Sequence, residues 1–254
     1  MITTLYYEAL EDLADLIVSS EASGFPKENL QDRSPETWFK PTVTTAVRID
    51  MDFGSGSERA ADSLILCGHD LFTQSSGIKL AWDASSFPAD EGFVIGNGGY
   101  HGAVSADEPI WRETFIDPGA KRYWSLYINT CTAAFHLGAI FLGSKFEGEV
   151  FLPRVRRKQP NLAIDYTYGG TRLAVEKGSM KRYREYNTYS RTTSELSNME
   201  DVAEEIGSMY HSIVLYVADE SLLMQAEVVK PFQSSLRRHE DWRWKIAFLE
   251  LPQV

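Results

Sequence analysis

A long run of alternating apolar and polar residues lies between Val43 and Phe53. Every odd position of these eleven residues carries Val, Thr, Ile, Met or Phe, whereas the even positions carry small or charged side chains. Period-two alternation of this length predicts a β-strand with one face on a core and the other in water. An α-helix would scatter Ile49 and Phe53 away from the other apolar positions. Trp38, just before the strand, is predicted to plug the core at the strand entrance.

Other segments have the length and composition of β-strands. The run DSLILC over 62–67 is typical of a strand buried on both faces, and Ile78, Leu80 and Trp82 alternate again. Further strands are predicted over 111–116, 122–128, 135–143, 172–175, 182–189 and 212–217. A final strand is predicted near the end of the chain, with an apolar face made of Trp242, Trp244, Ile246 and Phe248.

Two segments have helical spacing instead. Apolar residues recur every three or four positions between residues 4 and 18, which predicts a short helix there, although the pattern does not separate helix from strand at Leu16 to Ser19. Ser197 and Glu200 form a capping-box pattern, so a second helix is predicted from Ser197 to about Tyr210. Together the patterns predict a mainly β chain.

Composition narrows the function classes. The chain has 254 residues and a net charge of −11, enough length to bury a core without disulfides. Residues 1–150 hold 22 acidic and 10 basic side chains, whereas residues 151–254 hold 14 and 15. The acidic first part argues against nonspecific nucleic-acid binding, which needs cationic surface for phosphates. Cys67 and Cys131 lie in apolar runs and are expected to be buried free thiols.

The first 18 residues lack the basic start of a secretory signal and carry four acidic side chains. No apolar run approaches the roughly 20 residues that a membrane span needs. We therefore expect synthesis in a reducing cytoplasm, without a membrane span.

Catalytic motifs are not evident. The sequence has no Gly-x-Ser-x-Gly motif, and its five histidines lack zinc-ligand spacing. Each histidine is expected to be a core or corner residue. Asp50 and Asp52 share one strand face and could form a hydrolase pair or a metal site, but a solvated strand face is favoured. We expect no enzyme activity, no cofactor and no metal.

The first half of the chain also carries family-like motifs. The segment before the long strand contains Asn29, Leu30, Asp32, Thr37 and Trp38, and the strand ends in Asp52-Phe53-Gly54. The runs RYWSLYI over 122–128 and GAIFLG over 138–143 follow later. These motifs resemble the galactose-binding-like (discoidin-type) β-sandwich family. The resemblance implies a jelly-roll sandwich domain over residues 1–145.

The same resemblance implies a sugar or lipid site in loops at one end of the sandwich. The loops 22–40 and 84–111 are expected to form that end. The candidate ligand-binding residues are Trp82, Tyr100, His101, Trp111 and Arg112. The alternative is that these aromatic residues pack in the core or in a subunit interface.

The second half begins after a basic, proline-bounded connector over 146–160, which carries Arg154, Arg156, Arg157 and Lys158. This connector contacts an acidic partner or is a solvated linker. Residues 161–254 are predicted to be a smaller β-rich domain with one helix. The final stretch from Trp244 to Pro252 resembles a C-terminal module of phage tail and baseplate proteins.

The two resemblances suggest a virion structural protein of a bacteriophage tail tip or baseplate, made in the host cytoplasm. Such a protein would form a homo-oligomeric ring with other tail proteins and could bind a host surface glycan. The alternative is a carbohydrate-binding module without a virion role. A hydrolase is a third hypothesis, and it would depend on Asp50 and Asp52.

Overall fold

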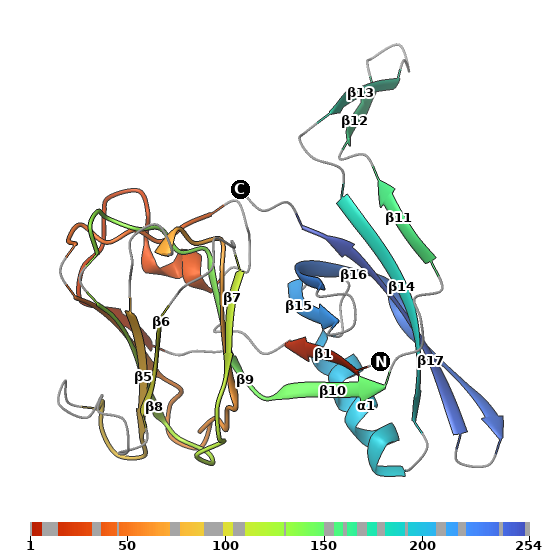
Figure 1. The fold of residues 1–254 in the computed structure, drawn as a ribbon, viewed down its shortest axis with the longest axis horizontal. Helices are drawn as coiled ribbons and strands as arrows, with labels where there is room; N and C mark the ends of the chain where they lie inside the picture. Colours follow the sequence, from red (N-terminus) through yellow and green to blue (C-terminus); the bar gives the residue numbers. More distant parts are fainter. Residues whose placement is uncertain are drawn as a thin grey trace. The chain divides into compact units, whose positions relative to one another are not determined.

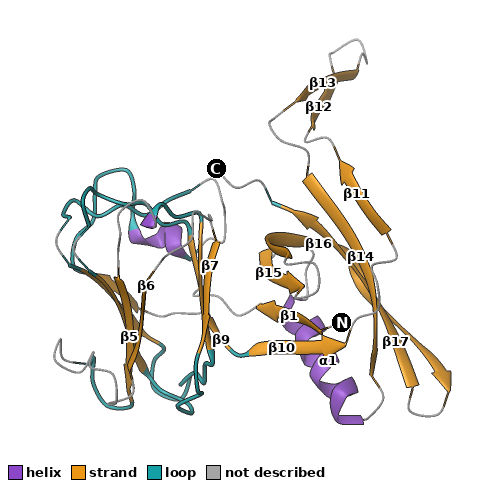
Figure 2. Cartoon of the chain, in the orientation of Figure 1, coloured by secondary structure: helices purple, strands orange, loops and turns teal. Residues whose placement is uncertain are grey.

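The structure is a computed structural model. It describes residues 2–6, 15–31, 37–44, 46–71, 77–88, 99–103, 110–129, 131–149, 155–159, 162–166, 172–176, 181–190, 193–206, 212–217, 222–238 and 241–251. As predicted, these residues are mainly β (Figure 2). The chain divides into two compact units, Tyr6–Lys145 and Phe146–Pro252 with Met1–Leu5.

The first unit is a sandwich of two antiparallel sheets (Figure 1). The order in the five-stranded sheet is β2 (Asp15–Val18), β3 (Val47–Asp52), β8 (Tyr123–Ile128), β5 (Gly77–Asp83) and β6 (Gly99–Ala103). The order in the three-stranded sheet is β7 (Ile110–Thr114), β4 (Ser63–Cys67) and β9 (Ala139–Gly143). A short 3₁₀ helix, Lys27–Leu30, lies between β2 and β3. The predicted β-sandwich is therefore confirmed.

The alternation in the long strand is confirmed from Val47 onward. In β3, Val47, Ile49 and Met51 are buried, and the polar residues between them are half-buried. Val43 lies outside the strand and is exposed. Strand β4 is buried at all five positions, as its continuous apolar run predicts. These strands line the core between the two sheets.

Register defines two ends of the sandwich. At one end of the five-stranded sheet, Tyr123 lies opposite both Asp52 and Asp83. At the same end of the three-stranded sheet, Ser63 lies opposite Gly143. We call this the linked end, because the first strand of the unit, β2, begins there at Asp15 and its last strand, β9, ends there at Gly143, so the chain is connected to the other unit through this end. Its segments are 52–62, 83–88 and 115–122. The opposite end is called the open end, and its described segments are 19–31, 37–44, 68–71 and 131–138.

The expectation that loops 22–40 and 84–111 form one end holds only in part, because β6 ends at Ala103 opposite Gly77 and β7 begins at Ile110 opposite Cys67, both at the open end. Strands β5 and β6 are antiparallel neighbours, so the segment between them leaves β5 after Asp83, at the linked end. The segment over 22–40 leaves β2 after Val18, at the open end. The position of the segment after Asp83 follows from the pairing of β5 with β6. The sequence alone does not reveal this pairing.

The helix predicted over residues 4–18 is wrong wherever the structure describes it. Residues Ile2–Tyr6 form strand β1, and Asp15–Val18 form β2, while residues 7–14 lie outside the described part. Strand β1 belongs to the sheet of the second unit. Tertiary pairing thus overrides an apolar spacing that is also compatible with a helix.

The second unit contains a seven-stranded sheet with the order β10-β1-β15-β16-β17-β14-β11, a two-stranded sheet of β12 and β13, and helix α1. The bounds are β10 Lys145–Glu149, β11 Val155–Gln159, β12 Leu162–Tyr166, β13 Arg172–Glu176, β14 Lys181–Ser190, α1 Thr193–Ile206, β15 Ser212–Val217, β16 Leu222–Arg238 and β17 Asp241–Glu250. Trp244, Ile246 and Phe248 are buried on β17, as predicted, whereas the side chain of Trp242 lies outside the described part.

Two expectations for this unit need correction. The predicted connector 146–160 contains most of β10 and all of β11, and β11 pairs with β14. An edge strand tolerates the basic residues that suggested a linker. The helix begins at Thr193, so Ser197 and Glu200 lie inside it and do not form its cap. Residues 207–210 lie outside the described part.

Candidate functional site at the open end

Two of the predicted ligand-binding residues belong to the core of the sandwich. The Trp82 ring lies 5.5 Å from the Phe115 ring and 5.3 Å from the Trp124 ring, between ring centroids. Trp111 is 9% exposed and belongs to the same hydrophobic cluster. For both residues the geometry favours the alternative of core packing.

The five predicted residues lie on strands of both sheets. Trp82 contacts Phe115, which follows Trp111 by four positions, a distance of about 13 Å along a strand. Trp111 and the half-buried Arg112 lie on β7 of the three-stranded sheet. Tyr100 and His101 occupy β6 positions opposite Leu80 and Lys79 in the other sheet. Ligand binding by this set remains a prediction.

A different group of side chains comes together at the open end. Phe39 and Leu137 form an isolated antiparallel bridge, with N···O distances of 2.8 and 3.0 Å in the two directions. Both side chains are fully buried. Because side chains alternate along extended backbone, the residues next to them face away from the core. These residues are Trp38, Lys40 and His136, and all three are half-buried.

Two glycines allow the backbone of this end to pack closely. Gly68 has a φ of +60°, a conformation that favours glycine. The Gly138 N–H lies 3.0 Å from both the Cys67 and Gly68 carbonyl oxygens. A Cβ on Gly138 would lie only 2.9 Å from the Cys67 oxygen. This packing joins the end of β4 to the segment before β9.

The tight junction places Asp70 against His136. The His136 backbone N–H donates to Asp70 Oδ1 at 2.8 Å, and His136 Nδ1 lies 3.1 Å from Asp70 Oδ2. Burial alone would raise the pKa of Asp70, but the hydrogen bonds from His136 outweigh it and hold that pKa below its usual value. With Nδ1 bound to the carboxylate, Nε2 is the ring nitrogen left to bind a ligand.

Trp38 and Lys40 lie beside this pair. The Trp38 ring centroid is 5.0 Å from that of His136. Lys40 Nζ lies 5.3 Å from the Trp38 ring centroid and 4.4 Å from that of Phe25, within the range of cation–π attraction. We call Trp38, Lys40, Asp70 and His136 the open-end cluster.

The backbone of Trp38 is also fixed, because Asn29 Nδ2 donates to its carbonyl oxygen at 2.7 Å. The indole Nε1–H of Trp38 is buried and has no acceptor among the residues that the structure describes. A buried donor of this kind is a site where an ordered water or a ligand atom can bind.

Sequence reasoning missed this cluster. Trp38 was expected to plug the core, but Phe39 is the fully buried residue and Trp38 is half-buried. His136 was expected to be a core or corner residue. The sequence feature that could have indicated the cluster is the alternation of amphipathic and apolar residues in Trp38-Phe39-Lys40 and in Phe135-His136-Leu137. Without the bridge between Phe39 and Leu137, nothing in the sequence joins the two segments.

His69 lies next to Asp70 and is buried. Burial lowers the pKa of His69 from 6.5 to about 4; the Asp70 charge opposes this shift and the His136 charge adds to it. The His69 ring is therefore neutral at pH 7, and its charging on acidification should destabilise the open end.

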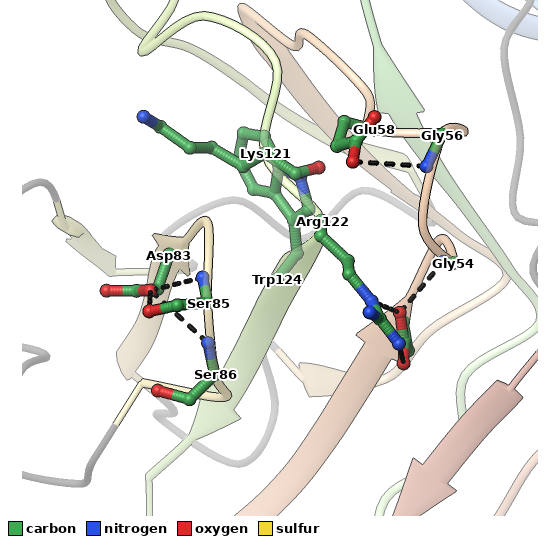
Figure 3. Close-up of polar contacts among 10 residues, drawn as sticks. Gly54, Gly56, Glu58, Asp83, Ser85, Ser86, Lys121, Arg122 and Trp124 are labelled. Atoms are coloured by element: carbon green, nitrogen blue, oxygen red, sulfur yellow. Dashed lines mark hydrogen bonds and ion pairs between the residues drawn. The ribbon is translucent and has the colours of Figure 1, made fainter.

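At the linked end, by contrast, charged side chains bind one another and the turns (Figure 3). Arg122 donates to both Asp52 carboxylate oxygens, at 2.7 and 2.9 Å, and the Gly54 N–H donates to Asp52 at 2.8 Å. The side-chain hydrogen bond from Arg122 lowers the pKa of Asp52, although burial opposes the shift. The Asp83 carboxylate accepts from the Ser85 N–H at 2.7 Å.

The Asp50 and Asp52 carboxylates have structural partners. Asp50 binds the Arg48 guanidinium at 2.6 Å and the Ser125 hydroxyl, while Asp52 binds Arg122. This arrangement favours structural roles for both carboxylates over a hydrolase pair. Among the described residues, no group of three or more His, Cys, Asp or Glu side chains could hold a metal ion. No described helix has the length and apolar character to cross a membrane.

Comparisons with known proteins concern the fold. No protein-family model matches the sequence, and no curated protein matches it. Solved structures with similarity include chitosan-binding module 1 of a Paenibacillus sp. IK-5 chitosanase/glucanase (15% identity, 53% of this chain, 98% of that chain, TM-score 0.41). Another is the family 32 carbohydrate-binding module of C. perfringens NanJ in complex with galactose (11% identity, 57% of this chain, 99% of that chain, TM-score 0.39).

A Ruminococcus gnavus fucosidase in complex with fucose is also similar, at 13% identity and a TM-score of 0.43, over 56% of this chain and 28% of that chain. At such identities and TM-scores, the likeness carries no conclusion about what this chain binds. The site has to be argued from its own side chains.

Proposed function

We propose that the sandwich unit is a non-catalytic carbohydrate-binding module whose site is the open-end cluster. The observation that carries the proposal is the half-buried Trp38 ring, which lies beside His136 and Lys40 next to a fully buried bridge. The sequence resemblance to galactose-binding-like domains supports the same function.

The chemistry of the cluster suits a sugar. An aromatic ring offers an apolar surface to the C–H face of a pyranose, and a few fixed polar groups bind its hydroxyls. His136 Nε2 can accept from a hydroxyl group while Asp70 holds Nδ1. Lys40 Nζ can donate to one. No nucleophile or catalytic carboxylate is needed for this role.

The framework reduces the cost of ordering the site on binding. Phe39 and Leu137 are fully buried, and the Asp70–His136 and Asn29–Trp38 hydrogen bonds fix the outward residues. Side chains that are already ordered lose less conformational entropy when a ligand binds. Less of the interaction energy with a sugar would then be lost to the ordering of side chains.

The test is a glycan array with the full chain, followed by calorimetry on a binding glycan. Trp38→Ala should weaken binding by roughly 10- to 100-fold, the range of an aromatic hot spot. His136→Ala should weaken it less. The control is Lys79→Ala, because Lys79 also lies near an aromatic ring, at 5.5 Å from Tyr127, but on β5. The proposal fails if no glycan binds, or if Trp38→Ala binds as tightly as the wild type.

The tail or baseplate role, assembly into a ring and location in a virion remain predictions from the sequence. They depend on the resemblance of the stretch from Trp244 to Pro252. Electron microscopy of a parent particle, labelled with an antibody against residues 1–145, would test them. Label at the tail tip is expected, and absence of the protein from purified particles would contradict the prediction.

A further inference from the structure

We propose that the carbohydrate bound at the open-end cluster is an acidic sugar whose carboxylate binds Lys40. This inference rests on the proposed function and specifies its ligand class. One ammonium group, held next to two aromatic rings, supplies the positive charge.

Lys40 differs from three arginines that form ion pairs within the chain. Arg48 binds Asp50, Arg122 binds Asp52, and Arg182 binds Glu250. The contacts of the Lys40 ammonium group are instead the rings of Phe25 and Trp38, and no described carboxylate lies within ion-pair distance of it. A charge held by aromatic rings keeps its capacity to bind an anion.

Backbone hydrogen bonds hold the main chain of Lys40. Its backbone N–H donates to the Phe25 oxygen at 3.4 Å, and its carbonyl oxygen accepts from Ala22 N–H at 2.8 Å. The rings of Phe25 and Trp38 then limit where its side chain can lie. A fixed ammonium beside an aromatic platform can select a ligand group by its charge as well as by its position.

The acidic residue of the cluster does not neutralise Lys40 directly. Asp70 accepts from both the backbone and the ring of His136, so its two oxygens already have donors. Residues 1–150 carry a net charge of −12, which would repel an acidic ligand at long range. Salt screens such repulsion beyond about 8 Å at physiological ionic strength, whereas a direct contact with Lys40 persists.

The experiment measures calorimetric affinity of the full chain for glucuronate, galacturonate and mannuronate oligosaccharides. Each is compared with its carboxyl-reduced counterpart, which has the same sugar stereochemistry and no charge. At least one acidic oligosaccharide should bind tenfold or more tightly than its counterpart. Lys40→Gln should remove this preference, whereas Lys40→Arg and the matched control Lys79→Gln should keep it.

The outcomes separate the two proposals. Equal affinity for acidic and reduced oligosaccharides, or a preference that survives in Lys40→Gln, overturns the acidic-sugar inference. If neutral glycans still bind and depend on Trp38, the carbohydrate-binding proposal stands without it. If neither acidic nor neutral glycans bind the wild-type chain, both proposals are contradicted. Unchanged thermal unfolding of Lys40→Gln would show that the variant is folded.

Discussion

The two ends of the sandwich use the same kinds of residues differently. At the linked end, Asp52 binds Arg122 and the Gly54 backbone, and Asp83 binds the turn that follows it. At the open end, Trp38, Lys40 and His136 face away from a buried bridge, and the Lys40 ammonium contacts only rings among the described residues. The number of charged residues is therefore a poor guide to a site. A better guide is whether the charged residues already have binding partners within the chain.

The largest expected change in the free energy of unfolding comes from the buried bridge of the open end. Phe39→Ala should destabilise the protein by about 3–5 kcal/mol, because it removes a fully buried ring. Val43→Ala, in the same segment but exposed, should change stability by less than about 0.5 kcal/mol. Urea denaturation measures both. Similar losses for the two variants would show that the bridge does not support the open end.

Acidification should weaken the open end through His69. Its pKa is about 4 in the folded protein and 6.5 when exposed, so the unfolded chain binds the proton first as pH falls. The stability due to the neutral ring is complete above about pH 6.5 and is lost progressively down to about pH 4. The expected loss is about 3 kcal/mol. Unfolding curves across this range should show a smaller pH dependence for His69→Asn than for the wild type.

Alanine substitution of one glycine at each end allows the stability of the two ends to be compared. Gly138→Ala would place a Cβ 2.9 Å from the Cys67 oxygen, so the backbone must shift, at a cost of about 2–3 kcal/mol. Gly119→Ala at the linked end meets no atom within 4 Å, but its φ of +76° costs about 1 kcal/mol. Thermal or urea unfolding should rank Gly138→Ala as the more harmful. The reverse order would contradict the close packing at the open end.

The smallest effect is expected for the ion pair of the linked end. Arg122→Ala removes two hydrogen bonds to Asp52, but the pair is partly exposed and screened by solvent. The pair lowers the pKa of Asp52, so its contribution is present near neutral pH and is lost as pH falls through that lowered pKa. NMR titration of Asp52 should show its pKa rise in the variant. An unchanged pKa would exclude this pairing in solution.

Much of the fold follows from the sequence, but pairing does not. Alternation identified β3, β4, β5 and β8, because each strand has at least one buried face. It failed for β1 and β11, which depend on distant partners, and the family resemblance did not show that the segment after Asp83 leaves its strand at the linked end. Such errors arise because strand order is a long-range property.

The candidate site was missed for a related reason. The bridge between Phe39 and Leu137 and the contact of Asp70 with His136 bring together segments far apart in the chain. Trp82 and Trp111 were chosen because aromatic residues near loops suggest ligand binding, but both pack in the core. A single sequence cannot separate a core tryptophan from a surface one when both follow strand alternation.

Sugar binding at the open end should be visible in one titration. The full chain, labelled with ¹⁵N, is titrated with a glycan that binds on the array, and the tryptophan indole signals are followed by NMR. We expect the Trp38 signal to shift in a saturable way, while the signals of Trp82 and Trp124 stay nearly fixed. Shifts of Trp82 with an unmoved Trp38 would contradict the account and place the site elsewhere.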